Sequence, residues 1–135
     1  MANANWALQQ AMLTALTSDS ALVALLGGEH VWDSVPARAP FPYVAFAGGT
    51  ERDWSTGTDQ GSEHAVGLHV WSRYAGRKEA QALIAAVRDV LHDAELSLTG
   101  HTLINLRHES SEIVRHSDGE TYQGIMRLRA VTEPQ

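Results

Sequence analysis

Residues 66–92 read VGLHVWSRY-AG-RKEAQALIAAVRDVLH, and this stretch decides the fold of the 135-residue chain. Residues 66–74 are rich in β-branched and aromatic side chains, which favour a strand. After the glycine at position 76, apolar residues recur at helical spacing and share one face. These residues are Ala80, Leu83, Ile84, Val87 and Leu91. The stretch therefore predicts one strand packed under one helix.

On the N-terminal side of this unit, residues 5–26 predict two consecutive short helices. Leucine and methionine recur there at helical spacing, and Ser18 and Asp19 stand where a second helix can be capped. Gly27 and Gly28 then provide a left-handed stop. This segment should cover part of a sheet.

Strand signals cover four further segments, which are residues 30–35, 43–49, 101–111 and 122–131. Prolines 36, 40 and 42 make the first of them an edge strand followed by a rigid connector. The polar residues 50–61 predict a long mobile hairpin loop, and HSDGE at 116–120 predicts a reverse turn. The predicted order is ααβββαββ, an α+β fold with a single antiparallel sheet packed on one face by helices. The length predicts one domain over residues 1–135.

Composition excludes several classes of protein. The chain has no cysteine, so disulfides and thiolate sites are excluded, and folding suits a reducing cytoplasm. Sixteen acidic and ten basic residues give a formal net charge of −6, which argues against a protein that grips duplex DNA. The N-terminus lacks a secretion signal and no apolar run reaches ~20 residues, so we expect a soluble protein with no membrane partner.

No spacing of residues predicts a catalytic, cofactor or metal site. The seven histidines do not recur at metal-ligand spacings, and neither a Gly-x-Ser-x-Gly elbow nor a phosphate-binding glycine loop occurs. Two pairs of acids, Glu109 with Glu112 and Asp53 with Asp59, have the chemistry of a glycosidase, but acids at turns and on strand faces are usually solvated. We therefore predict a protein that is not an enzyme and has no cofactor.

Four tryptophans stand out, of which Trp6, near the terminus, either seals the first helix or contacts a neighbour. Trp32 and Trp71 lie in predicted strands and are expected in the core, where a large ring fills the space between sheet and helix. Trp54 lies in the polar loop, where it either anchors another chain or folds back over its own domain. The residues assigned to this docking loop are Arg52, Asp53, Trp54, Ser55 and Asp59.

Arg127 and Arg129 are two apart on the last predicted strand and so lie on one face, which makes a positive strip with Arg107 on the preceding arm. The favoured interpretation is cross-strand pairing with Glu109 or Glu112. The alternative is a seam of ion pairs between subunits.

The sequence resembles the tail-completion, or tail-terminator, family of long-tailed bacteriophages and related gene transfer agents, over roughly residues 6 to 133. The landmarks occur in the family's order. In addition to residues 66–92 they are Val31-Trp32-Asp33, Val35-Pro36, Pro42-Tyr43-Val44, and Tyr122-Gln123-Gly124 followed by Arg127 and Arg129.

This resemblance implies a subunit made in the host cytoplasm that closes into a homo-hexameric ring on the last ring of the tail tube. The ring would stop polymerisation of the major tail-tube protein and present a surface to the head-side connector, with DNA passing through the lumen without specific binding. In this hypothesis the docking loop contacts a neighbouring ring, and the edge at residues 31–35 and the hairpin strands form the ring interface. Another head-tail connector subunit, such as a stopper or neck protein, is the main alternative, followed by a small-molecule enzyme.

Overall fold

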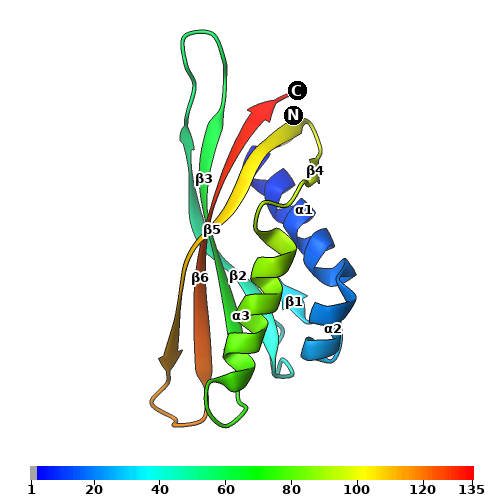
Figure 1. The fold of residues 1–135 in the computed structure, drawn as a ribbon, viewed down its shortest axis with the longest axis vertical. Coiled ribbons are helices and arrows are strands. Elements are labelled where there is room, and N and C mark those ends of the chain that lie inside the picture. The colour runs from blue at the N-terminus through cyan, green and yellow to red at the C-terminus, as the bar shows by residue number, and fades with distance from the viewer. Residues whose placement is uncertain (1–2) are drawn as a thin grey trace.

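A computed structural model describes residues 3–135, and it places three helices on one face of a twisted sheet (Figure 1). The helices are α1 (Ala4–Ser18), α2 (Ser20–Leu26) and α3 (Lys78–Leu91). The strands are β1 (Val31–Trp32), β2 (Tyr43–Asp53), β3 (Ser62–Ser72), β4 (Ser97–Leu98), β5 (His101–Arg115) and β6 (Tyr122–Pro134). The predicted α+β class is confirmed. Residues 1 and 2, which the predicted domain includes, lie outside the described residues.

The sheet has six strands in the order β1-β2-β3-β6-β5-β4. All neighbours are antiparallel except β1 and β2, which pair in parallel with Val31 opposite Val44. The prediction of a purely antiparallel sheet was therefore wrong at this edge. The connector of residues 33–42, with its three prolines, returns the chain to the same end of the sheet before β2 begins. The short strand β4 was not predicted.

The two predicted N-terminal helices are confirmed with their boundary. Asp19 caps α2, because its carboxylate accepts a hydrogen bond from the Leu22 backbone N–H at 3.0 Å. Gly27 ends the helix in the left-handed conformation, with φ of 78°. No helix within residues 3–135 is long and apolar enough to cross a membrane.

The core lies between the helices and the inner face of the sheet, the face that the helices cover. All five residues of the predicted α3 face are buried. They pack in one apolar cluster with residues of the other elements, among them Leu8, Met12, Leu16, Leu22, Leu68, Val70, Leu106, Met126 and Leu128. The central prediction, one strand under one helix, is thus confirmed.

Gly124 in β6 lets α3 approach the sheet. A Cβ atom at this position would lie 2.4 Å from Val70 Cγ2 and 2.9 Å from Ile84 Cδ1. We expect Gly124→Ala to lower the free energy of unfolding, measured with urea, by about 1–3 kcal/mol, which is the usual cost of overpacking. Gly57→Ala is the control, because nothing lies within 4 Å of its Cβ position. Equal stability of the two variants would contradict the close approach.

Trp32 and Trp71 were predicted in the core, and this prediction was wrong. Side chains alternate along β3, so the buried Val70 points to the helices and the half-buried Trp71 points to the outer face, the face of the sheet without helices. There the two tryptophans flank Tyr43, with ring centroids 5.6 Å and 6.2 Å from it. They form an aromatic row across β1, β2 and β3.

The hairpin of β2 and β3 is longer than predicted and extends past the helices (Figure 1). Residues 50–53, predicted as loop, continue β2, and the loop is confined to residues 54–61. A bulge interrupts the register between Ala47 and Thr50, at Gly48 and Gly49. Because a bulge adds twist to its strand, it re-aims the outer arm of the hairpin.

The predicted C-terminal hairpin is confirmed, with strands that extend further than expected at β5 and β6. In its turn, the Asp118 carboxylate accepts hydrogen bonds from the Thr121 hydroxyl at 2.6 Å and from the Thr121 and Glu120 backbone N–H groups at 2.8 and 2.9 Å. These bonds lower the pKa of Asp118 to about 2. The turn is therefore held by an ionised carboxylate at neutral pH.

Candidate functional site

The outer face of the sheet carries the predicted arginine strip. Met126 and Leu128 of β6 are buried among the helices, so the alternating Arg127 and Arg129 point outward, as predicted. Arg107 of β5 lies directly opposite Arg129 in the register. The three arginines thus lie on neighbouring strands of one uncovered face.

A glutamate on β3 organises this face. The Glu63 carboxylate accepts hydrogen bonds from the Nε–H groups of both Arg52 and Arg129. Burial raises the pKa of Glu63, but the hydrogen bonds from Arg129 and Arg52 outweigh it and hold the pKa below its ordinary value. Arg52, Glu63 and Arg129 therefore form a charged triad, which crosses β2, β3 and β6.

Trp54 packs on this charged triad. Its ring centroid lies 5.7 Å from Arg52 Cζ and 5.1 Å from Arg129 Cζ, within the range of cation–π attraction. The residue is nevertheless 47% exposed. Trp54 thus folds back on its own domain, as one of its two interpretations predicted, and still presents an exposed aromatic surface; its contact with another chain stays a prediction. The structure also joins two sets predicted separately, the docking loop and the arginine strip.

The favoured partner assignment for the strip is confirmed for one arginine. Arg127 Nη2 lies 3.2 Å from Glu112 Oε1 on the neighbouring strand. Arg129 instead pairs with Glu63, which is 66 residues away in sequence and could be found only from the pairing of β3 with β6. Among the described residues, neither Glu109 nor Arg107 makes an ion pair.

The loop tip is closed by its own hydrogen bonds. The Asp53 carboxylate accepts from the Ser55 backbone N–H at 3.0 Å, and the Thr56 hydroxyl accepts from the Asp59 N–H at 3.0 Å. Hydrogen bonds that the Ser55 side chain and backbone donate to the Asp53 carboxylate lower the pKa of Asp53. The loop that was predicted to be mobile is thus a turn with defined internal contacts.

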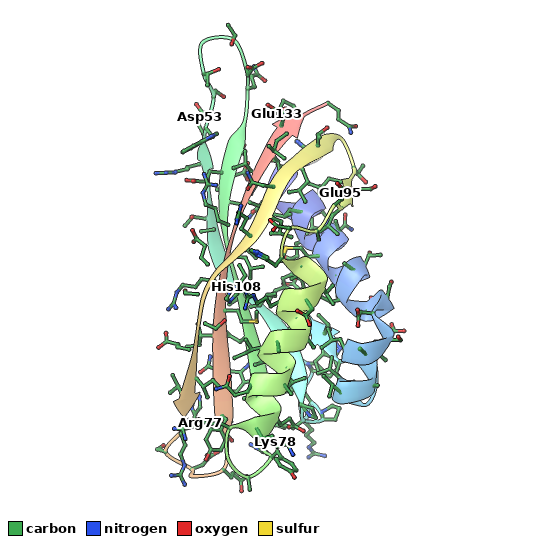
Figure 2. All side chains as sticks on the ribbon, viewed as in Figure 1. Asp53, Arg77, Lys78, Glu95, His108 and Glu133 are labelled. Atoms are coloured by element: carbon green, nitrogen blue, oxygen red, sulfur yellow. The ribbon has the colours of Figure 1, made fainter. Side chains whose placement is uncertain are left out.

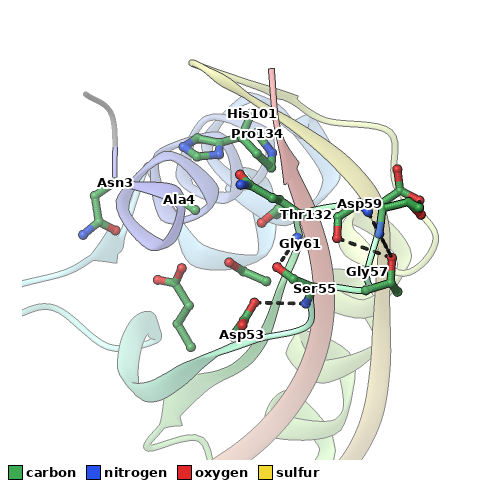
Figure 3. Close-up of a pocket in the computed structure, with 15 residues that line it drawn as sticks. Asn3, Ala4, Asp53, Ser55, Gly57, Asp59, Gly61, His101, Thr132 and Pro134 are labelled. Atoms are coloured by element: carbon green, nitrogen blue, oxygen red, sulfur yellow. Dashed lines mark hydrogen bonds between the residues drawn. The ribbon is translucent and has the colours of Figure 1, made fainter.

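A hollow of about 670 Å³ lies between this loop and the start of α1 (Figure 3). The candidate acid pair, Asp53 and Asp59, lines it together with Glu51 and His101. Asp53 is ionised at neutral pH and so is not arranged as a general acid. Among residues 3–135, no group of three or more acidic or histidine side chains is placed to hold a metal ion.

One buried histidine that the sequence did not single out ties α1 to the sheet beside this hollow. His64 Nδ1 lies 3.0 Å from Asn5 Oδ1, and His64 Nε2 lies 2.9 Å from Thr132 Oγ1. Burial lowers the pKa of His64. His64 is therefore a structural residue at the base of the hairpin.

Comparison with known proteins confirms the resemblance seen in the sequence. The model of the family "Tail completion protein gp17" matches residues 10–133. The tail completion protein gp17 of Bacillus phage SPP1 is 27% identical over 126 residues, which cover 93% of this chain and 92% of the relative.

Two solved structures share the fold. A chain in the virion of a native gene transfer agent particle superposes with a TM-score of 0.88 at 30% identity, covering 98% of this chain and 99% of that chain. The structure of the bacteriophage SPP1 gp17 protein superposes with a TM-score of 0.65 at 25% identity, covering 94% and 89%. Because the family model spans nearly the whole chain, the chain belongs to the tail completion protein gp17 family.

Proposed function

We propose that this chain is a structural subunit, acting as a single domain over residues 1–135, that closes the head-proximal end of a tail tube. Six copies form a ring on the last ring of the tube, end its polymerisation and join it to the head-side connector. The observation that carries this proposal is the family match over residues 10–133, together with the similar chain in a gene transfer agent virion. The subunit is made in the host cytoplasm and then becomes part of the particle.

A ring of identical subunits needs two unlike surfaces that meet when the rotation closes. Two free strand edges supply candidates. β1 pairs only with Val44 and Ala45, so the remainder of β2 on that side is unpaired, and β4 pairs only with the first two residues of β5. An interface of the usual size, about 800 Å² per partner, fits such edges. The strip of Arg107, Arg127 and Arg129 lies between them and is proposed to face a neighbouring subunit.

The two ends of the subunit differ, which is what termination requires. At one end of the long axis the β2–β3 hairpin extends past the helices, and at the other end the turns before α3 and between β5 and β6 lie together (Figure 1). We assign the projecting loop, with Asp53, Ser55 and Asp59, to contact with a neighbouring ring. The other end does not repeat that surface, so a further tube ring finds no matching partner.

The net charge suits a ring through which DNA moves. A formal charge of −6 gives little attraction for phosphates, and an acidic lumen lets a duplex pass without being held.

The test is to shorten the hairpin in the particle-producing host. The backbone N–H of Trp54 donates a hydrogen bond to the backbone oxygen of Gly61 at 2.9 Å. Residues 55–60 can therefore be replaced by Asn-Gly, which suits a two-residue turn. We expect the variant to fold and to retain Trp54, but to reduce head-joined tails by at least about 100-fold, counted by electron microscopy and by infectious or transducing titre.

The matched control replaces residues 55–60 by six Gly and Ser residues, which keeps the length and removes the side chains. A reduction in head-joined tails with both variants would assign docking to the side chains of residues 55–60. Normal particles with the shortened loop would refute the docking assignment. Normal tail length and joining without the protein would refute the proposed function, and a position on the connector away from the tube would favour a stopper or neck subunit.

A further inference from the structure

We infer that Trp54 and Arg52, which the docking-loop hypothesis assigned to a neighbouring ring, instead insert into a groove at the β5 edge of the next subunit of the same ring, while the tip of the loop keeps the contact with the neighbouring ring. The groove, called here the acidic groove, is lined by Asp93, Glu95, Leu96, Leu103, Ile104 and Asn105, with Ala94 and Leu106. This inference rests on the proposed function and names the two surfaces that meet. The partner is a second copy of this chain.

The inserting side is a preorganised aromatic anchor. Trp54 packs against two guanidinium groups and remains 47% exposed. The side chain of Arg52 is 68% exposed, although its Nε–H is bound to Glu63. Glu63 and the ionised Asp53 offset the charges of Arg52 and Arg129, so the positive group that this site presents to solvent is the exposed guanidinium of Arg52. Rigid aromatic and arginine side chains of this kind are typical interface hot spots.

The receiving side has an acidic rim and a mixed polar and apolar lining. The side chain of Asp93 is 60% exposed, and Glu95 is exposed and makes no ion pair within residues 3–135. Ile104 stands in a register shift of β5 between Leu103 and Asn105, and it is 49% exposed. The acidic rim around the exposed Ile104 and the half-buried Leu96 and Leu103 complements an exposed indole with an arginine beside it.

The groove offers open space and one buried acceptor without a partner within residues 3–135. Its volume is about 360 Å³, an order of magnitude above the ~30 Å³ of a water molecule. Asn105 Oδ1 is buried without a hydrogen-bond partner among the described residues. An indole N–H is a donor only, so it has the chemistry to pair with this carbonyl oxygen. We expect Arg52 to pair at the rim with Glu95.

The two surfaces are placed for closure of a ring. Asp53, adjacent to Trp54, and Glu95 lie on opposite sides of the subunit and toward the same end of its long axis (Figure 2). Copies set side by side around an axis near that direction bring the two together as a heterologous contact. Duplex DNA is a poorer partner for the anchor, because Glu63 already accepts hydrogen bonds from both guanidinium groups and the exposed, ionised Asp53 is adjacent.

Disulfide trapping tests the contact, and because the chain has no native cysteine, only the introduced thiols can form disulfides between subunits. Gln60→Cys and Ala94→Cys place thiols beside the anchor and the groove and leave Trp54, Arg52, Glu95 and the docking residues in place. We expect oxidised particles carrying both substitutions to give a ladder of linked species up to the hexamer on a non-reducing gel. Gln60→Cys with Ala24→Cys, which is exposed on α2, should give none.

A charge reversal tests the chemistry of the contact. In the trapping background, Glu95→Arg should reduce the linked yield at least tenfold, whereas Glu29→Arg, which changes the net charge equally, should not. Particles with joined tails that contain the protein and give no ladder would overturn this inference and leave the proposed function standing. Absence of the protein from the tail would defeat the proposed function itself. Duplex binding by the wild type that Arg52→Gln abolishes would assign the anchor to DNA and would also overturn the inference.

Discussion

Gly49→Ala is expected to lower the free energy of unfolding by about 2–3 kcal/mol, at the upper end of overpacking costs. A Cβ atom at this position would lie 2.1 Å from the backbone oxygen of Ala65. A backbone atom cannot move aside as the end of a flexible side chain does. The bulge between Ala47 and Thr50 must therefore open or shift its register.

The neighbouring glycine provides a matched control. Nothing lies within 4 Å of a Cβ atom built on Gly48, so Gly48→Ala should change stability by less than about 0.5 kcal/mol in urea unfolding. The two variants differ by one position in the same bulge. Equal denaturation midpoints would show that the close approach of β2 to β3 is wrong.

The consequence of Gly49→Ala should reach the proposed interface. The outer arm of the hairpin places Arg52 opposite Glu63, and the Glu63 carboxylate holds Arg129 as well. A register shift at the bulge would separate these groups, and Trp54 would lose the two guanidinium groups that hold it. We therefore expect Gly49→Ala also to reduce the number of joined tails in particles assembled below the unfolding temperature, and Gly48→Ala not to do so.

Acidification is expected to destabilise the protein through His64. Asn5 Oδ1 can only accept, so His64 Nδ1–H donates to it. Burial favours the neutral ring, in which Nε2 accepts from the Thr132 hydroxyl. Burial lowers the pKa of His64 in the folded state, while nearby Glu51 raises it and His101 lowers it. Between the two pKa values, His64 is therefore protonated in the unfolded chain and neutral in the folded chain.

The sign of the pH dependence follows from this difference. The contribution of the neutral ring is fully present above the unfolded pKa of about 6.5. It is lost as the pH falls from that value through the lowered folded pKa, at a slope of at most about 1.4 kcal/mol per pH unit. His69 and His108 also have lowered pKa values, mainly through burial, and they add to the loss in the same direction.

His64→Gln isolates the contribution of His64, because an amide can donate and accept but does not titrate in this range. We expect the variant to be less stable by about 1–2 kcal/mol at pH 7.5, where one hydrogen bond loses its geometry. The difference in free energy of unfolding between wild type and variant should become smaller toward pH 5, because only the wild type loses stability through protonation of His64. His69 and His108 contribute equally to both proteins. Parallel stability profiles between pH 7.5 and 5 would show that His64 does not titrate with unfolding.

Local sequence predicted much of the fold because the relevant forces act over a few residues. The helical spacing of Leu83, Val87 and Leu91 predicted the buried face of α3, and Asp19 with Gly27 predicted the ends of α2. The turn at residues 116–120 followed from side chains that bond to their own backbone. The resemblance to tail-completion proteins rested on the order of such local landmarks.

Pairing between distant strands decided what the sequence alone could not. The parallel contact of β1, the extension of β2 to Asp53 and the outward position of Trp71 depend on register, which no local pattern specifies. The candidate surface depends on it most, because Glu63 meets Arg129 across 66 residues. The sequence by itself thus determined the helices, the turns and the class of the fold, whose causes are local. Only the tertiary structure brought Trp54, Arg52 and Arg129 together, because the energy of those contacts exists only after β2, β3 and β6 have paired.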